Sequence, residues 1–192
     1  TDAERYIKIV EDNPQNDEAW RNFGITLFKL GIYGEAEKKI VIAVKTNPHN
    51  DRAWGNLGIL LAKLQLYPAS IIALYKAVNL NPQNDEAWRN LGNFLVKFAQ
   101  YDKAAILFAK TTAINPLNVN AWMDWGAFLI ELGLYAGAIE KCTKALVIDP
   151  QNDRAITMWG LALSKLGLYS GGIKKCAKAL DINPQSKDAR RN

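Results

Sequence analysis

Apolar and polar side chains alternate along the chain with the spacing of amphipathic helices. The segment from Asp85, written DEAWRNLGNFLVKF, is a representative example. Its apolar residues fall three or four positions apart, which predicts one apolar helical face. That face comprises Trp88, Leu91, Leu95 and Phe98. Acidic residues at positions 85 and 86 suit the start of a helix, because the helix dipole favours negative charge there.

A second helix is predicted after the break around Tyr101. Its inward-facing residues are expected to be Ala104, Phe108 and Thr111. The helix should end before Pro116, because the residue that precedes a proline is driven out of the helical region. The segment therefore indicates two helices joined by a short turn.

The same pattern returns every 34 residues, in four independent series. The prolines are Pro14, Pro48, Pro82, Pro116, Pro150 and Pro184; the fourth-place residues are Trp20, Trp54, Trp88, Trp122 and then Ile156; the glycines are Gly24, Gly58, Gly92, Gly126 and Gly160; the tyrosines are Tyr33, Tyr67, Tyr101, Tyr135 and Tyr169. A fixed period of this length is the sequence signature of a repeat architecture.

A 34-residue helix–turn–helix unit with W-x-x-L-G, then Tyr, Ala, an aromatic residue and Pro, resembles the tetratricopeptide repeat. The resemblance implies an all-α, right-handed α-solenoid, a superhelix of stacked repeats. The predicted boundaries are 1–16 for the second helix of a partial repeat, 17–50, 51–84, 85–118, 119–152 and 153–186 for five complete repeats, and 187–192 for the start of a further helix or a tail. We expect one continuous solenoid domain. Departures from the family pattern occur at Ser70, Cys142, Ile156, Gly172 and Cys176.

Side chains that could support catalysis are scarce. The one histidine, His49, stands beside Pro48 in a predicted turn, and no Gly-rich phosphate-binding loop is present. Cys142 and Cys176 occupy the same place in consecutive units, so we expect buried thiols too far apart for a disulfide. We therefore predict a protein that is not an enzyme and that has no cofactor and no metal site.

Charge is distributed unevenly. The net charge is +5, and residues 1–96 hold 11 basic and 11 acidic side chains, whereas residues 97–192 hold 13 and 8. This excess is too small to indicate nucleic-acid binding. No apolar run reaches the roughly 20 residues of a membrane span. Reduced cysteines and the lack of a signal-like start favour the cytoplasm, and the missing initiator Met suggests a fragment.

In the family, the first helix of each repeat lines a concave groove, at the second, fifth, ninth, twelfth and thirteenth places of the unit. The resemblance therefore implies a peptide-binding groove here. The candidate groove residues are Arg21, Ile25, Phe28, Lys29, Ile59, Lys63, Arg89, Asn93, Val96, Lys97, Met123 and Arg154. Lys29, Lys63 and Lys97 occupy the thirteenth place of three successive units, and we call them the lysine rail. These lysines favour an acidic partner, and the apolar residues would serve as anchors. Asn93 is the candidate for a hydrogen bond to the ligand backbone.

Some members of the family grip a chaperone's C-terminal carboxylate with a clamp of basic residues and asparagines. Arg89, Asn93 and Arg154 match that clamp, whereas Asp124 and Met158 do not. An acid inside a carboxylate site repels its ligand, which argues against a complete clamp.

A second surface is predicted on the outer, convex face, where several places on the second helices are apolar. They are Val41, Ile42, Ile72 and Ile106. A contiguous apolar patch marks an interface, so self-association or end-to-end stacking stays open.

The function expected from the resemblance is a non-catalytic protein–protein interaction module, an adaptor or scaffold. The alternatives are a self-assembling homo-oligomeric scaffold, or the tetratricopeptide segment of a larger enzyme or chaperone-cofactor protein.

Overall fold

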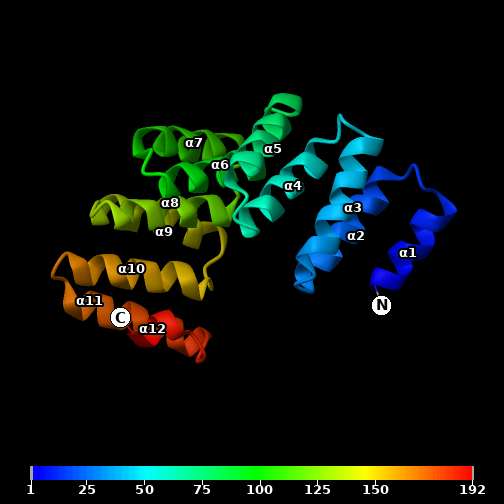
Figure 1. Cartoon of the computed structure of the whole chain (residues 1–192). Helices are drawn as coiled ribbons and strands as arrows, with labels where there is room; N and C mark the ends of the chain where they lie inside the picture. The colour runs from blue at the N-terminus through cyan, green and yellow to red at the C-terminus, as the bar shows by residue number, and fades with distance from the viewer. Residues whose placement is uncertain (1, 192) are drawn as a thin grey trace. The chain divides into compact units, whose positions relative to one another are not determined.

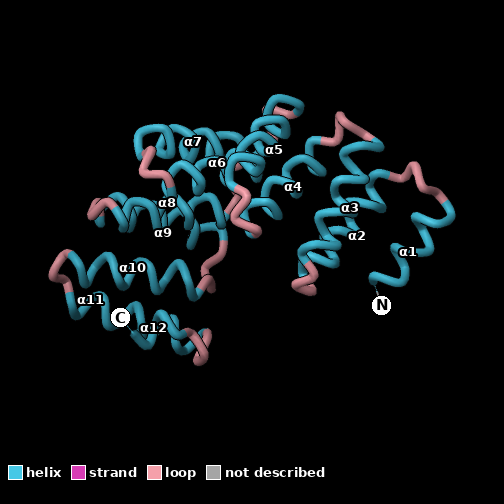
Figure 2. The backbone as a smooth tube through the Cα atoms, in the orientation of Figure 1, coloured by secondary structure: helices cyan, strands magenta, loops and turns pink. Residues whose placement is uncertain are grey.

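A computed structural model describes residues 2–191 of the chain, and these residues form twelve α-helices and no strand (Figures 1 and 2). The helices are α1 (Asp2–Asp12), α2 (Asp17–Lys29), α3 (Tyr33–Thr46), α4 (Asp51–Lys63), α5 (Tyr67–Leu80), α6 (Asp85–Lys97), α7 (Tyr101–Ile114), α8 (Val119–Glu131), α9 (Tyr135–Ile148), α10 (Asp153–Lys165), α11 (Tyr169–Ile182) and α12 (Lys187–Arg191). From α2 to α11 each 34-residue unit contributes one pair, so the predicted all-α class and helix–turn–helix repeat are confirmed.

An asparagine fixes the start of each first helix. The Asn50 side chain accepts a hydrogen bond from the Ala53 amide at 2.9 Å, and the same cap is made by Asn16, Asn84, Asn118 and Asn152. Such a cap satisfies one of the backbone N–H groups that a helix start leaves without a partner. The second helices end one residue before the Asn-Pro or Asp-Pro pair, as the proline series predicts.

The residue between the two helices of a unit has a left-handed backbone. Gly31, Gly133 and Gly167 supply this conformation, with φ between 74° and 81°. Gln65 and Ala99 adopt it without the freedom of glycine, at φ 62° and 55°. The turn therefore has the same geometry in all five units, although glycine occupies it in only three.

The tryptophan and proline series share a period because the two residues bind each other. Each tryptophan Nε1 donates to the carbonyl of the proline six residues earlier, as between Trp54 and Pro48 at 2.9 Å. The other pairs are Trp20–Pro14 at 2.9 Å, Trp88–Pro82 at 3.0 Å and Trp122–Pro116 at 2.8 Å. At the start of α12, Arg190 takes the tryptophan's place and donates to the Pro184 carbonyl.

Backbone contacts divide the chain into two compact bodies, Thr1–Phe94 and Leu95–Asn192. We call them the N-terminal body and the C-terminal body and describe each by itself. The expectation of one continuous domain stays a prediction.

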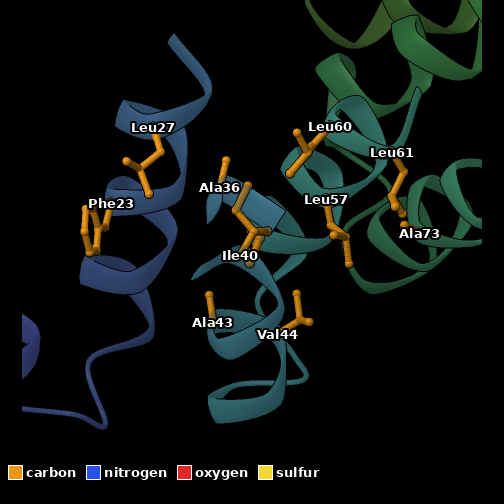
Figure 3. Packing of buried hydrophobic residues seen from close by; sticks show 11 residues of the cluster. Phe23, Leu27, Ala36, Ile40, Ala43, Val44, Leu57, Leu60, Leu61 and Ala73 are labelled. Carbon is orange, nitrogen blue, oxygen red and sulfur yellow. The ribbon is translucent and has the colours of Figure 1, made fainter. Parts of the chain in front are cut away.

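The core of the N-terminal body runs between successive helices (Figure 3). Ile40 of α3 is 1% exposed and belongs to one buried cluster with Phe23 of α2 and Leu57 of α4. Gly24 permits this packing, because a Cβ added there would lie 2.4 Å from Ile40 Cγ1. The two helices of a unit thus approach closely where the glycine series places no side chain.

In the C-terminal body the rings of Phe108 and Phe128 lie 5.5 Å apart within a buried cluster. Ala104, Phe108 and Thr111 are fully buried, as the pattern predicts. The expectation for Phe98 is wrong: α6 ends at Lys97, and the Phe98 side chain lies after the helix and is 46% exposed. The apolar face of α6 therefore stops one turn earlier than the periodicity suggests.

Candidate functional site

A cavity of about 400 Å³ lies on the first helices of the N-terminal body. Its walls come from α2, α4, α6 and the loop that precedes α6. The residues that matter for its chemistry are Arg21, Asp51, Arg52, Asn56, Ile59 and Asn90. Five of these six carry polar or charged groups, so the cavity suits a polar segment of a ligand better than a large apolar side chain.

Arg21, which lines this cavity, has an unsatisfied donor. Its side chain is 14% exposed, and its Nη2 lies 2.6 Å from Glu18 Oε2. Its Nε is buried and has no hydrogen-bond partner among the described residues. A buried donor without a partner costs about 1–3 kcal/mol, so a ligand acceptor that reaches this group when the side chain moves would relieve that cost.

Of the three acids in the cavity wall, Asp51 is already engaged. Asp51 Oδ2 accepts hydrogen bonds from Asn81 Nδ2 at 3.0 Å and from Asn84 Nδ2 at 2.7 Å. Because both donors belong to the loop before α6, Asp51 fixes that loop against α4. Its negative charge therefore holds the loop in place. The other charged residues of the wall are the acids Asp85 and Glu86 and the cations Arg21 and Arg52.

The two thiols are buried and unpaired with each other. Burial raises the pKa of Cys142 to about 11 and also raises the pKa of Cys176. Both therefore stay protonated near neutral pH, and a protonated thiol is a poor nucleophile.

The described residues offer neither a cluster of metal ligands nor a membrane-spanning helix. Residues 2–191 contain no group of three or more His, Cys, Asp or Glu side chains placed to hold a metal ion. No helix in that range has both the length and the apolar character needed to cross a membrane.

Comparison with known families and structures identifies the repeat. Two family models, both described as tetratricopeptide repeat, match residues 22–85 and 73–105. Residues 22–105 are therefore identified as tetratricopeptide repeats. No match was found among curated protein sequences.

Solved tetratricopeptide structures share the fold at low sequence identity. YrrB, described as a TPR protein with an unusual peptide-binding site, is 21% identical with a TM-score of 0.67, over 98% of this chain and 97% of that one. MamA from Desulfovibrio magneticus RS-1 is 19% identical with a TM-score of 0.72, over 89% and 97%. A chain of the APC/C hetero-tetramer Cut9–Hcn1 is 17% identical with a TM-score of 0.88, over 98% of this chain and 38% of that one.

The predicted groove residues of the N-terminal repeats come together only in part. Arg21 and Ile59 line the same cavity. Lys29 and Lys63 are exposed and do not line it, and Lys63 Nζ lies 5.9 Å from the centre of the Tyr33 ring. Lys29 and Lys63 therefore belong to the exposed surface of this body and not to the cavity.

The remaining candidates of this body also lie outside the cavity. Ile25 and Phe28 are half-buried, and Phe28 packs against the core cluster. Arg89 is half-buried and Asn93 is exposed. The hydrogen bond expected from Asn93 to a ligand backbone stays a prediction.

In the C-terminal repeats the expectation for Met123 is wrong. Met123 is only 4% exposed and packs with Ala145 and Ala155, because the fifth place of its repeat faces the next first helix. Val96 is half-buried against the neighbouring core, and Lys97 is exposed. Arg154 lines a second cavity, formed within this body.

The predicted outer apolar surface is less exposed than expected. Val41 is half-buried and packs against the core of the N-terminal body, so its assignment to an exposed patch is wrong. Ile42 is also half-buried. Ile72 of the N-terminal body and Ile106 of the C-terminal body are 68% and 66% exposed. Self-association through these residues stays a prediction.

Two cavity residues, Asn56 and Asn90, were missed by sequence reasoning. Both occupy the sixth place of a repeat, where Asn22 also stands, so an amide series with the 34-residue period was available in the sequence. The family pattern directed attention to the fifth and ninth places instead. Asn90 Nδ2 donates to the Glu86 carbonyl at 2.8 Å, which leaves its amide oxygen as the group free to accept from a ligand.

Proposed function

We propose that the chain is a non-catalytic protein–protein interaction module that binds a peptide or protein segment along its first helices. The observation that carries this proposal is the buried Nε of Arg21, a donor without a partner in the wall of the 400 Å³ cavity. The peptide-binding site in the name of YrrB supports the proposal by analogy of fold.

The cavity fits a backbone segment with a carbonyl or carboxylate near Arg21. Asn56 and Asn90 add amide groups that can pair with a peptide bond, which presents one donor and one acceptor. Ile59 supplies apolar contact on the same wall. Affinity would come from several such contacts along the repeats, with no covalent chemistry.

The test begins with capture of partners from native lysate and their identification by mass spectrometry. The captured partner is then titrated against the double variant Arg21→Ala/Asn56→Ala. Loss of one charged hydrogen bond costs about 1.5–3 kcal/mol, so we expect binding at least about tenfold weaker.

The matched control is Lys38→Ala, which removes an exposed cation of the same body whose ion pair with Glu35 lies on α3. It should leave the affinity unchanged. Circular dichroism must show that both variants stay folded. Unchanged affinity in the folded double variant would mean that the partner binds elsewhere.

A further inference from the structure

The whole net charge of the chain is concentrated in its last repeat and the helix that follows. Residues 153–191 hold eight basic and three acidic side chains, and the remaining residues are balanced. The basic side chains are Arg154, Lys165, Lys174, Lys175, Lys178, Lys187, Arg190 and Arg191. An excess of one sign on so short a segment attracts ligands of the opposite sign.

Part of this charge gathers around a cavity of about 580 Å³ formed by α10, α12 and the loop between α11 and α12. The cations that line the cavity are Arg154, Lys165 and Arg191. Its apolar lining comes from Met158 and Leu161. The single acid on the wall is Asp188. The cavity therefore combines positive charge with an apolar surface.

The three cations are not occupied within the protein. Among residues 2–191, no ion pair involves Arg154, Lys165 or Arg191. This contrasts with Arg21 in the other cavity, whose guanidinium is held by Glu18. Cations that have no internal partner keep their full capacity for an external anion.

The mixture of groups distinguishes between anionic ligands. Single-stranded nucleic acid binds through aromatic platforms as well as through positive charge. The tryptophan of this repeat, Trp159, is covered by Lys175, whose Nζ lies 3.3 Å from the ring centre. Trp159 does not line the cavity, and no aromatic side chain is among the lining residues, so the cavity offers no stacking platform to a base. An acidic protein segment needs only carboxylates for the cations and an aliphatic side chain for Met158 and Leu161.

We propose that this cavity is a second ligand site, which binds an acidic protein segment carrying an aliphatic side chain. Arg154, Lys165 and Arg191 pair with its carboxylates, and Met158 and Leu161 receive the aliphatic group. The inference rests on the proposed interaction function and assigns to one of its sites the chemistry of the partner. It also assigns the recognition of acidic ligands to this cavity of the C-terminal body, whereas the sequence pattern assigned it to the lysine rail.

The test uses the full chain and a fluorescent probe peptide that alternates pairs of glutamates with leucines. Binding is followed by fluorescence anisotropy. We expect Arg154→Glu to weaken binding by about tenfold or more, because it reverses a charge within contact distance of the ligand. Lys174→Glu, which reverses an exposed charge of the same repeat outside the cavity, should weaken it by less than about threefold. A probe with glutamine in place of each glutamate should bind at least about tenfold more weakly.

Three outcomes would overturn the site. Equal effects of Arg154→Glu and Lys174→Glu would mean that only the net charge matters. Equal binding of the glutamate and glutamine probes would exclude charge recognition. Tighter binding of a single-stranded oligonucleotide or of anionic lipid vesicles, lost in Arg154→Glu, would assign the cavity to that class of ligand.

The partner captured from lysate separates this inference from the proposed function. Binding that is lost in Arg21→Ala/Asn56→Ala and kept in Arg154→Glu would refute the second site and leave the proposed function intact. Binding that is lost in both variants supports both.

Discussion

The amide of Asn50 donates a hydrogen bond to the carboxylate of Asp17 across 33 residues of chain, with 2.6 Å between Nδ2 and Oδ2. The same side chain caps α4 by accepting from the Ala53 amide. Asn84 repeats both contacts, at 2.7 Å to Asp51 and 2.9 Å to the Ala87 amide. At α4 and α6, one asparagine thus ties the start of a first helix to the start of the preceding one, which keeps these repeats in register.

We predict that Asn50→Ala destabilises its repeat more than Asn152→Ala does. Asn152 caps α10 and donates to Asp149, but the first place of its repeat is Val119, so it ties no earlier helix start. The loss should be about 1 kcal/mol for the cap alone and about 2–3 kcal/mol for the cap and the tie together. Native-state hydrogen exchange of the α4 and α10 amides measures each locally. Equal losses would show that the tie to Asp17 adds nothing.

The exception at Val119 gives a second prediction. In other repeats the asparagine before the proline, such as Asn81, donates to the aspartate at the first place. In the repeat that begins with Val119 this asparagine is replaced by Asp149, which accepts from Asn152 at 3.0 Å. Val119→Asp alone should destabilise the protein by about 1 kcal/mol or more, because two carboxylates would then compete for one amide. Adding Asp149→Asn should restore the usual arrangement. A double-mutant cycle in urea should show coupling of about 0.5–3 kcal/mol, and purely additive effects would contradict this account.

Two glycines of the same repeat should respond to alanine with opposite signs. Gly24→Ala places a methyl group 2.4 Å from Ile40 Cγ1 and 3.0 Å from the Ala36 carbonyl oxygen, so the helices must separate. We expect a loss of about 1–3 kcal/mol. Gly34→Ala, in the first turn of α3, meets nothing within 4 Å and should gain about 0.4–1 kcal/mol by restricting the unfolded chain. Thermal melts of the two variants provide the comparison, and a loss at Gly34 would refute the argument.

Alkaline pH should destabilise the C-terminal body through Cys142. Burial raises the pKa of this thiol from 9.0 to about 11, so the folded state keeps a proton that the unfolded state releases. Its contribution is therefore complete below about pH 9 and is lost as the pH rises from about 9 to 11. The loss should approach about 3 kcal/mol. Urea midpoints of wild type and Cys142→Ala should converge over this range, because lysine titration affects both equally. A constant difference would contradict the burial effect.

Much of the fold was predictable because its local signals agree. The Asn-Pro pairs, the acidic first turns and the glycine series each mark a boundary or a contact within one unit, and the helices follow them closely. The positions of Phe98, Val41 and Met123 were predicted less well. For Phe98 the helix ended at the left-handed Ala99 turn, which periodicity alone does not locate.

The sequence by itself determined the repeat, the helix pairs and the residues that pack inside each unit, because these depend on short-range capping, turn geometry and helical periodicity. Only the tertiary structure decided what lies between units. It buried Met123 against the next first helix, packed Val41 against the core and brought Arg21 of one repeat to Asn56 and Asn90 of the next two. The same place in successive repeats has different neighbours, and exposure depends on the neighbour's side chain. For that reason the repeat pattern predicts which face of each helix is apolar, whereas the packing of particular side chains decides which residues a ligand can reach.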